Sequence, residues 1–149
     1  MCELSDESKR KCEGLITIDK CESVLKIMKV NKSPGLDGLP TEFYRCLWSS
    51  VGQLLVDMYN ESFLKCELPD SLKTAVMSLI FKKGDCQLIA NYRPISLTNI
   101  DYRILAFALS QRMQAVISDI VNPNQSAYIR GRFIGNNIRL VEDIIDYYD

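Results

Sequence analysis

Apolar residues recur at helical spacing in four stretches of the chain. They repeat every three or four positions over residues 17–28, from Pro40 to before Pro69, over 98–120, and from 134 to the end of the sequence. This period is typical of amphipathic helices, because positions three and four apart share one face. The second stretch is expected to begin at Pro40, since proline suits the first turn of a helix.

The period changes at residues 75–81, whose sequence AVMSLIF is short, apolar and partly β-branched. This composition is typical of a buried strand. A turn at 83–85 leads to a second strand at 93–97, and Pro94 near its start indicates that this strand lies at an edge or begins late. One hairpin among helical stretches predicts a helix-rich α+β fold.

Residues 32–38, with the sequence KSPGLDG, predict a loop through their turn chemistry. The glycines are expected to permit a left-handed backbone in a tight turn. Asp37 is expected to accept hydrogen bonds from amides of its own loop in preference to binding a ligand.

Length and composition fit one ordinary domain with a packed core. The chain has 149 residues, of which 47% are apolar and 25% are charged. Residues 1–14 are polar and unpatterned, and we expect them to form a disordered leader.

Several classes of site are excluded by composition. The chain has no histidine, which removes Ser-His and Cys-His nucleophile pairs and every histidine zinc site. Its six cysteines show no CxxC pair, so thiols in a reducing compartment are expected. No apolar run is long enough to span a membrane, and the first residues are too polar for a signal peptide. We therefore expect an intracellular protein, in the nucleus or the cytoplasm.

Charge is unevenly distributed along a chain whose formal net charge is -1. Residues 65–132 hold nine Lys or Arg against five Asp or Glu, an excess of +4, so the remainder carries -5. A locally basic middle suits a polyanionic partner, although a solvated surface explains the same excess.

Three cations lie at the ends of the two predicted strands. Lys82 and Lys83 follow the first strand, and Arg93 begins the second. Across the tip of a hairpin they would grip a triphosphate, with bidentate donors from arginine and point charges from lysine. The alternative is that they keep an edge strand from aggregating.

Four blocks of sequence resemble the reverse transcriptases of LINE-type (non-LTR) retrotransposons. The blocks are NKSPGLDGLP at 31–40 with EFY at 42–44; LIFKKGD at 79–85; NYRPISL at 91–97 with DY at 101–102 and Arg112; and NQSAYI at 124–129 with GR at 131–132 and NI at 137–138. Their order and spacing are similar to those of that family's fingers and early palm, and the resemblance covers residues 14–149. Departures include Ala127, Phe81 and Leu72, which replace a usual glycine, proline and tryptophan.

The resemblance implies the fingers and the start of the palm of a right-hand polymerase. Residues 15–70 would be a helical N-terminal extension of the fingers, and 71–149 a partial reverse transcriptase domain. The implied activity is RNA-directed DNA synthesis. The implied partners are an RNA template, a DNA primer, a deoxynucleoside triphosphate and the palm and thumb missing from this chain, with no membrane.

The resemblance also assigns roles to individual residues. Lys82 or Lys83 and Arg93 would contact the phosphates of the incoming nucleotide. Two apolar residues, Ile95 and Leu97, would lie near the templating base, although packing in a core explains their alternation equally well. Two further cations, Arg130 and Arg132, would lie near the backbone of the template or primer.

No catalytic residue and no metal ligand is expected within this chain. The family holds two divalent cations on an Ala-Phe-Asp block and an aromatic-Ala-Asp-Asp block, and neither occurs here. Asp143, Asp146 and Asp149 recur along one side of a predicted helix, where a solvated face is the better interpretation. Mg²⁺ is expected only in a complete polymerase, so the fragment alone should be inactive. The alternatives are a stand-alone nucleic-acid-binding module and a non-functional relic of a truncated element.

Overall fold

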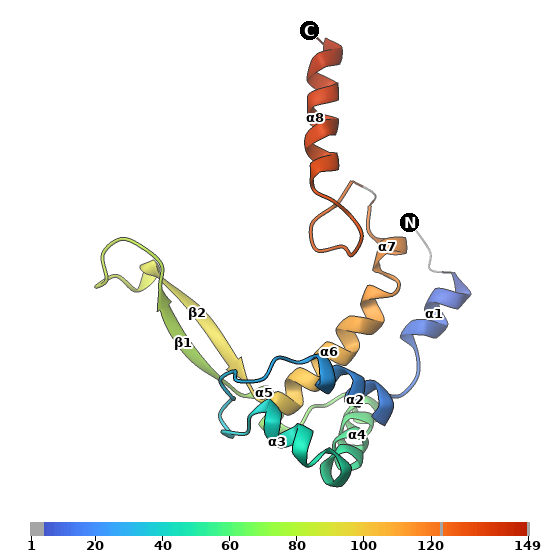
Figure 1. Cartoon of the computed structure of the whole chain (residues 1–149), viewed down its shortest axis with the longest axis vertical. Helices are drawn as coiled ribbons and strands as arrows, with labels where there is room; N and C mark the ends of the chain where they lie inside the picture. The colour runs from blue at the N-terminus through green and yellow to red at the C-terminus, as the bar shows by residue number, and fades with distance from the viewer. Residues whose placement is uncertain (1–4, 123, 149) are drawn as a thin grey trace. The chain divides into compact units, whose positions relative to one another are not determined.

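The computed structural model describes residues 5–122 and 124–148, and Figure 1 shows their helices and strands. The chain divides into two compact units. The central unit is Leu15–Ala108, and the terminal unit combines Met1–Gly14 with Leu109–Asp149.

The helices of the central unit follow the apolar periodicity. They are α2 (Ile18–Ile27), α3 (Thr41–Cys46), α4 (Trp48–Lys65), α5 (Asp70–Lys73) and the greater part of α6 (Ile100–Gln114). The stretch that begins at Pro40 ends before Pro69, as predicted, but it forms two helices instead of one. Leu47 separates them, because its backbone (φ -103°, ψ 13°) ends α3 before α4 begins.

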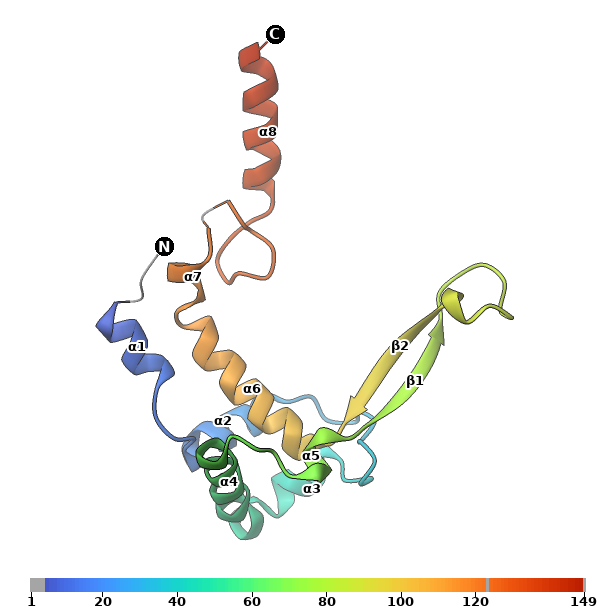
Figure 2. The ribbon, with the colours of Figure 1, turned by 180° about the vertical axis from the view of Figure 1, so that it is seen from behind.

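Side chains from α2, α4 and α6 form the core of the central unit, and these three helices lie together in Figure 1 and Figure 2. The fully buried members include Cys21, Val24, Tyr59, Ile100, Ile104 and Ala108. The hydroxyl of Tyr59 donates a hydrogen bond to the carbonyl oxygen of Asp101 at 2.7 Å. Burial raises the pKa of Tyr59 well above its ordinary value, so the phenol stays neutral.

The two predicted strands form an antiparallel hairpin. Strand β1 (Ala75–Phe81) pairs with β2 (Tyr92–Thr98), from Ala75 opposite Thr98 to Phe81 opposite Tyr92. The prediction that the first strand is buried is wrong, because every residue of β1 is exposed. Within the described residues the sheet has two strands only, and β2 is exposed over its middle residues and half-buried at its ends.

The terminal unit contains α1 (Asp6–Cys12), α7 (Ile117–Ile120) and α8 (Gly135–Tyr148). The pattern of polar residues did not predict α1. Ser5 caps this helix by accepting a hydrogen bond from the Ser8 amide, and the Ser8 hydroxyl donates to Asp119 Oδ2 at 2.9 Å. The predicted helix over 98–120 forms two helices, since α6 ends at Gln114 and α7 begins at Ile117.

Helix α8 has the predicted extent, but none of its residues is buried. Its exposed apolar side chains include Ile138, Val141, Ile144, Ile145 and Tyr148. Asp143 and Asp146 are exposed on the same helix, as expected of a solvated face, and Asp149 lies outside the described residues. In the described part of the chain, no helix combines the length and the apolar character needed to cross a membrane.

Five cysteines lie in the described part of the chain: Cys12 is half-buried, Cys21 is buried, and Cys46, Cys66 and Cys86 are exposed. Cys2 lies outside the described residues.

Candidate nucleic-acid interface

Hydrogen bonds join the two sides of the tip of the β1–β2 hairpin. The amide of Lys82 donates to the carbonyl of Asn91 at 2.8 Å, and Asn91 Nδ2 donates to the carbonyl of Asp85 at 2.8 Å. Gly84 has φ +92°, and a Cβ at this position would lie 2.8 Å from Asn91 Nδ2. The predicted turn is confirmed, and Gly84 is required both by its backbone conformation and by its close neighbour.

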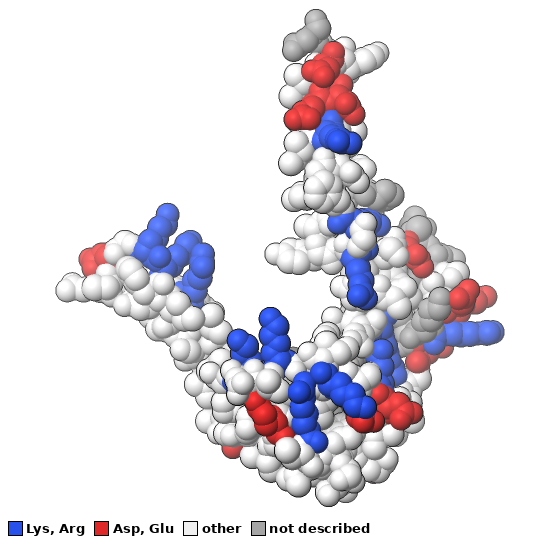
Figure 3. Space-filling model, in the orientation of Figure 1, with Lys and Arg blue, Asp and Glu red and all other residues white. Residues whose placement is uncertain are grey.

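The register of the hairpin brings two of the predicted cations to one face. Ile80 pairs with Arg93, and side chains alternate along a strand, so Lys82 extends from the same face as Arg93. Lys83 follows in the turn. Figure 3 shows positive side chains gathered at this tip.

All three of these cations are exposed. Within residues 5–122 and 124–148, none of Lys82, Lys83 and Arg93 forms an ion pair. The one acid between residues 82 and 93 is Asp85, whose Oδ1 accepts a hydrogen bond from the Gln87 amide at 2.9 Å. The tip therefore carries a net charge of +2, and its cations are free to bind an anion.

Ile95 and Leu97 continue the face that carries Arg93. Ile95 is 41% exposed and Leu97 is half-buried. Packing in a core therefore does not explain Ile95, and both residues extend an apolar surface from the cations toward the base of the hairpin.

In the terminal unit, the guanidinium of Arg132 is occupied by backbone carbonyls. It donates to Ser118, Val121, Asn122 and Gln125 at distances from 2.6 to 3.1 Å. These bonds hold the loop before α8 in place. The prediction that Arg132 lies near a nucleic-acid backbone therefore concerns a side chain whose two Nη groups already donate to carbonyls of its own unit.

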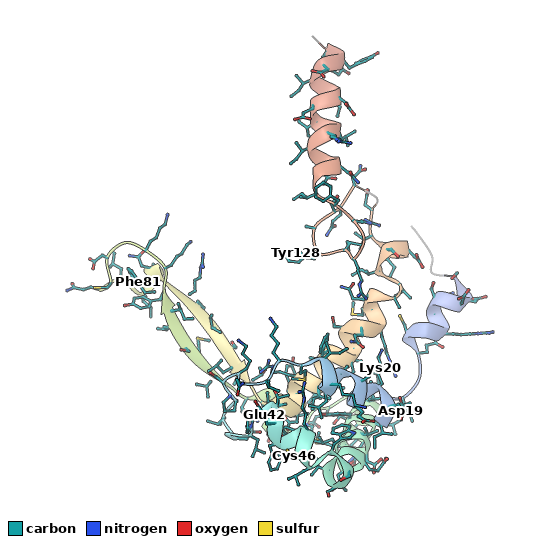
Figure 4. All side chains as sticks on the ribbon, viewed as in Figure 1. Asp19, Lys20, Glu42, Cys46, Phe81 and Tyr128 are labelled. Carbon is teal, nitrogen blue, oxygen red and sulfur yellow. The ribbon has the colours of Figure 1, made fainter. Side chains whose placement is uncertain are left out.

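Arg130 lies two residues earlier and is exposed. Its loop is closed by Ser126, whose hydroxyl donates to Asn137 Oδ1 at 2.9 Å, and by Asn137 Nδ2, which donates to the Asn124 carbonyl at 2.9 Å. The sequence block 124–132 thus forms a hydrogen-bonded loop that presents Arg130 to solvent. Tyr128, which Figure 4 labels, is 97% exposed on the same loop.

The loop over 32–38 confirms the predicted role of Asp37, whose Oδ1 accepts a hydrogen bond from the Leu39 amide at 3.0 Å. Gly38 has the expected positive φ, +72°. Gly35 is needed for a different reason, because a Cβ there would lie 2.1 Å from Asn99 Oδ1 and 2.5 Å from the Asn99 amide nitrogen. This loop therefore contacts the start of α6 directly.

Sequence reasoning missed the residues that position these loops. Asn91 and Tyr92 hold the hairpin tip, since the Tyr92 hydroxyl donates to the Cys86 carbonyl at 2.9 Å. Arg45 and Asn99 hold the segment after α2. An asparagine at a turn was the available signal for Asn91, whereas nothing in the linear pattern identifies the partner of Arg45.

The described residues do not fit a metal site, because no three His, Cys, Asp or Glu side chains among them are grouped to hold an ion. The exposed cations at the hairpin tip and at Arg130 can thus bind an anion. Among the described residues, no group of three carboxylates lies beside them.

Over most of its length the chain is homologous to proteins of non-LTR retrotransposons. No protein-family model matches it. It is 42% identical to the transposon TX1 uncharacterized 149 kDa protein of Xenopus laevis over 144 residues, which are 97% of this chain and 11% of that protein. It is 26% identical over 130 residues to the retrovirus-related Pol polyprotein from the type-1 retrotransposable element R1 of Bradysia coprophila, covering 85% of this chain and 13% of that protein.

The chain therefore spans about a tenth of the length of the relatives it matches.

Proposed function

We propose that this chain forms the fingers and the start of the palm of a reverse transcriptase of a non-LTR retrotransposon. The observation that carries the proposal is the hairpin tip with three exposed and unpaired cations, Lys82, Lys83 and Arg93. Homology to retrotransposon proteins, one of them a Pol polyprotein, supports it.

The role of the tip is to bind the triphosphate of a deoxynucleotide. Arg93 offers a planar fork of donors to two phosphate oxygens, and the lysines add point charges. Lys82 and Arg93 share one face of the hairpin, so they engage the same phosphate chain. Ile95 and Leu97 continue that face and offer an apolar surface to a base.

The template and the primer lie against the second cationic element. Arg130 is exposed and contacts a phosphate directly. Arg132 acts indirectly, since its four hydrogen bonds hold the loop that carries Arg130. The palm and thumb of the parent polymerase supply the remaining surface, together with the carboxylates that hold Mg²⁺.

The test is a titration of the whole chain with a deoxynucleoside triphosphate, followed by the fluorescence of its one tryptophan and by calorimetry. Lys82→Gln, Lys83→Gln and Arg93→Gln are each expected to weaken binding about tenfold, since a hydrogen bond to a charged group contributes about 1.5 kcal/mol. Lys65→Gln is the matched control, because Lys65 is an exposed lysine on α4 whose ammonium contacts Glu61.

The proposal fails if the control weakens binding as much as the tip variants do. It also fails if the tip variants leave triphosphate affinity unchanged while circular dichroism shows the native helix content.

A further inference from the structure

An open groove lies in the central unit between the end of α2 with its following segment and the middle of α6. Its volume is about 580 Å³. The lining residues are Ile27, Met28, Lys29, Lys32, Arg103, Ala106 and Phe107. Three of these are cations, none is acidic, and the others give the groove an apolar floor with one aromatic ring.

Helix α3 fixes the wall that carries the two lysines. Arg45 donates from Nε to the carbonyl of Leu25 at 3.1 Å, and from Nη2 to those of Lys26 and Met28 at 2.9 and 2.7 Å. These carbonyls end α2 and have no partner within the helix, so the guanidinium satisfies them. The backbone from which Lys29 projects is therefore held in place.

A second contact from α3 fixes the next turn. Asn31 has a left-handed backbone (φ +56°), and its amide donates to Glu42 Oε1 at 2.6 Å. This hydrogen bond lowers the pKa of Glu42, so the carboxylate is charged near neutral pH. Figure 4 labels Glu42 on α3. Gly35 then brings the segment after α2 against Asn99, one residue before α6. This contact joins the wall that carries the two lysines to the wall formed by α6.

The groove cations are not neutralised by the protein. Within the part of the chain that the structure describes, Lys29, Lys32 and Arg103 form no ion pair. Glu42 does not line the groove, and its Oε1 accepts the hydrogen bond from the Asn31 amide. Three like charges around one concavity repel each other, and a polyanion relieves that repulsion. Figure 3 shows positive side chains over the segment that follows α2.

We infer that this groove binds single-stranded nucleic acid, with phosphates on Lys29, Lys32 and Arg103 and a base on Phe107. A cationic groove with an aromatic platform is the arrangement by which proteins hold single strands, because the cations follow the backbone and every base has a face to stack. An acidic peptide would satisfy the cations but would leave Phe107 and the apolar floor uncovered. The groove and the hairpin tip share no residue, so the inference holds whether or not the tip binds a triphosphate.

The test measures binding of the whole chain to a labelled single-stranded RNA of about 12 nucleotides by fluorescence anisotropy. Three phosphate contacts predict a logarithmic salt slope of about -2, so a fourfold rise in salt lowers affinity about 20-fold. Lys29→Gln, Lys32→Gln and Arg103→Gln each remove one contact, and the same rise in salt should then lower affinity only about 7-fold. Lys20→Gln, on α2 but outside the groove lining, should leave the slope unchanged.

A second pair of measurements tests the base contact. Phe107→Leu keeps an apolar side chain but removes the ring, and it should weaken binding of the RNA at least about fivefold. The same variant should bind an abasic strand of equal length as tightly as the unaltered chain does.

Three results would overturn the inference: a slope changed equally by Lys20→Gln, no effect of Phe107→Leu on the RNA, or equal competition by polyglutamate. The part of strand binding that depends on Phe107 reports on the groove, and the triphosphate titration reports on the hairpin tip. Lys82→Gln should reduce triphosphate binding and leave the Phe107-dependent part of strand binding intact, so the two proposals fail separately.

Discussion

Gly35 joins two segments that lie far apart in the sequence. Its α-carbon lies so close to Asn99 that no side chain fits between them. The neighbouring Gly38 has open space around its α-carbon and is needed only for its positive φ. Two glycines of one loop thus serve different purposes, of which the turn chemistry predicted the second and not the first.

Gly35→Ala is expected to lower the free energy of unfolding by about 3 kcal/mol or more, because backbone atoms of Asn99 must move. Gly38→Ala is the control and should cost about 1 kcal/mol, the strain of a left-handed alanine. Urea denaturation measures both. Equal losses would show that the contact with Asn99 does not determine the conformation of the loop.

Asp101 provides a prediction about pH. Burial raises the pKa of its carboxyl, although its Oδ1 accepts a hydrogen bond from the Tyr102 amide. The folded state therefore binds the proton more tightly than the unfolded chain does. Stability is accordingly lost as pH rises from the unfolded value of about 3.9 through the raised folded value.

Asp101→Asn removes this loss, since a neutral amide keeps the acceptor for Tyr102. The variant should be more stable than the unaltered chain at about pH 7, and the gain should shrink at about pH 3, where both side chains are neutral. Urea midpoints at the two pH values measure the difference. A gain that is equal at both would show that the charge of Asp101 is not its cause.

At the scale of elements, the hairpin and α8 share an unusual property. Both are apolar in sequence and both are exposed in the described structure. The short, partly β-branched apolar run over 75–81 marks a strand, but the pattern does not specify which layer covers it. Periodicity predicts how a segment folds locally, whereas burial depends on what packs against it.

The exposure of α8 leads to a testable difference from the core. Replacing Ile138 and Ile145 together by serine should change the free energy of unfolding by no more than about 0.5 kcal/mol per site, as is usual for surface positions. The same change should lower binding of a hydrophobic dye and self-association, because it reduces an exposed apolar patch.

The matched control is Ile104→Ser on α6, where the side chain is fully buried. Removing it should cost about 3 kcal/mol or more. If the α8 variant is destabilised as much as this control, α8 packs against another part of the chain in solution.

At the scale of the whole molecule, homology to retrotransposon proteins covers most of this chain and about a tenth of its relatives. Cations in both units are placed to meet a polyanion, at the hairpin tip, in the groove beside α6 and at Arg130. No described carboxylates are grouped to hold a metal ion. These three places are the ones on which the proposals for triphosphate and nucleic-acid binding rest.

The whole chain is therefore expected to incorporate no deoxynucleotide on a primed RNA template with Mg²⁺ or Mn²⁺, because phosphoryl transfer of this kind needs carboxylate-held cations. Extension of a labelled primer measures this directly. Incorporation that is abolished by Lys83→Ala or Arg93→Ala would contradict the expectation, since it would show synthesis by this chain itself.

The sequence by itself determined where most helices, both strands and the turns form, although not α1, because periodicity, proline and glycine act within a few residues. It predicted the hairpin with its Gly84 turn, the Asp37 loop and the extent of α8. Only the tertiary structure decided what each element contacts. Three findings depend on residues far apart in the chain. Strand β1 is exposed, Arg132 holds its own loop, and Arg103 and Phe107 line one groove with the segment after α2. No local pattern records such pairings, because packing is set by the whole fold.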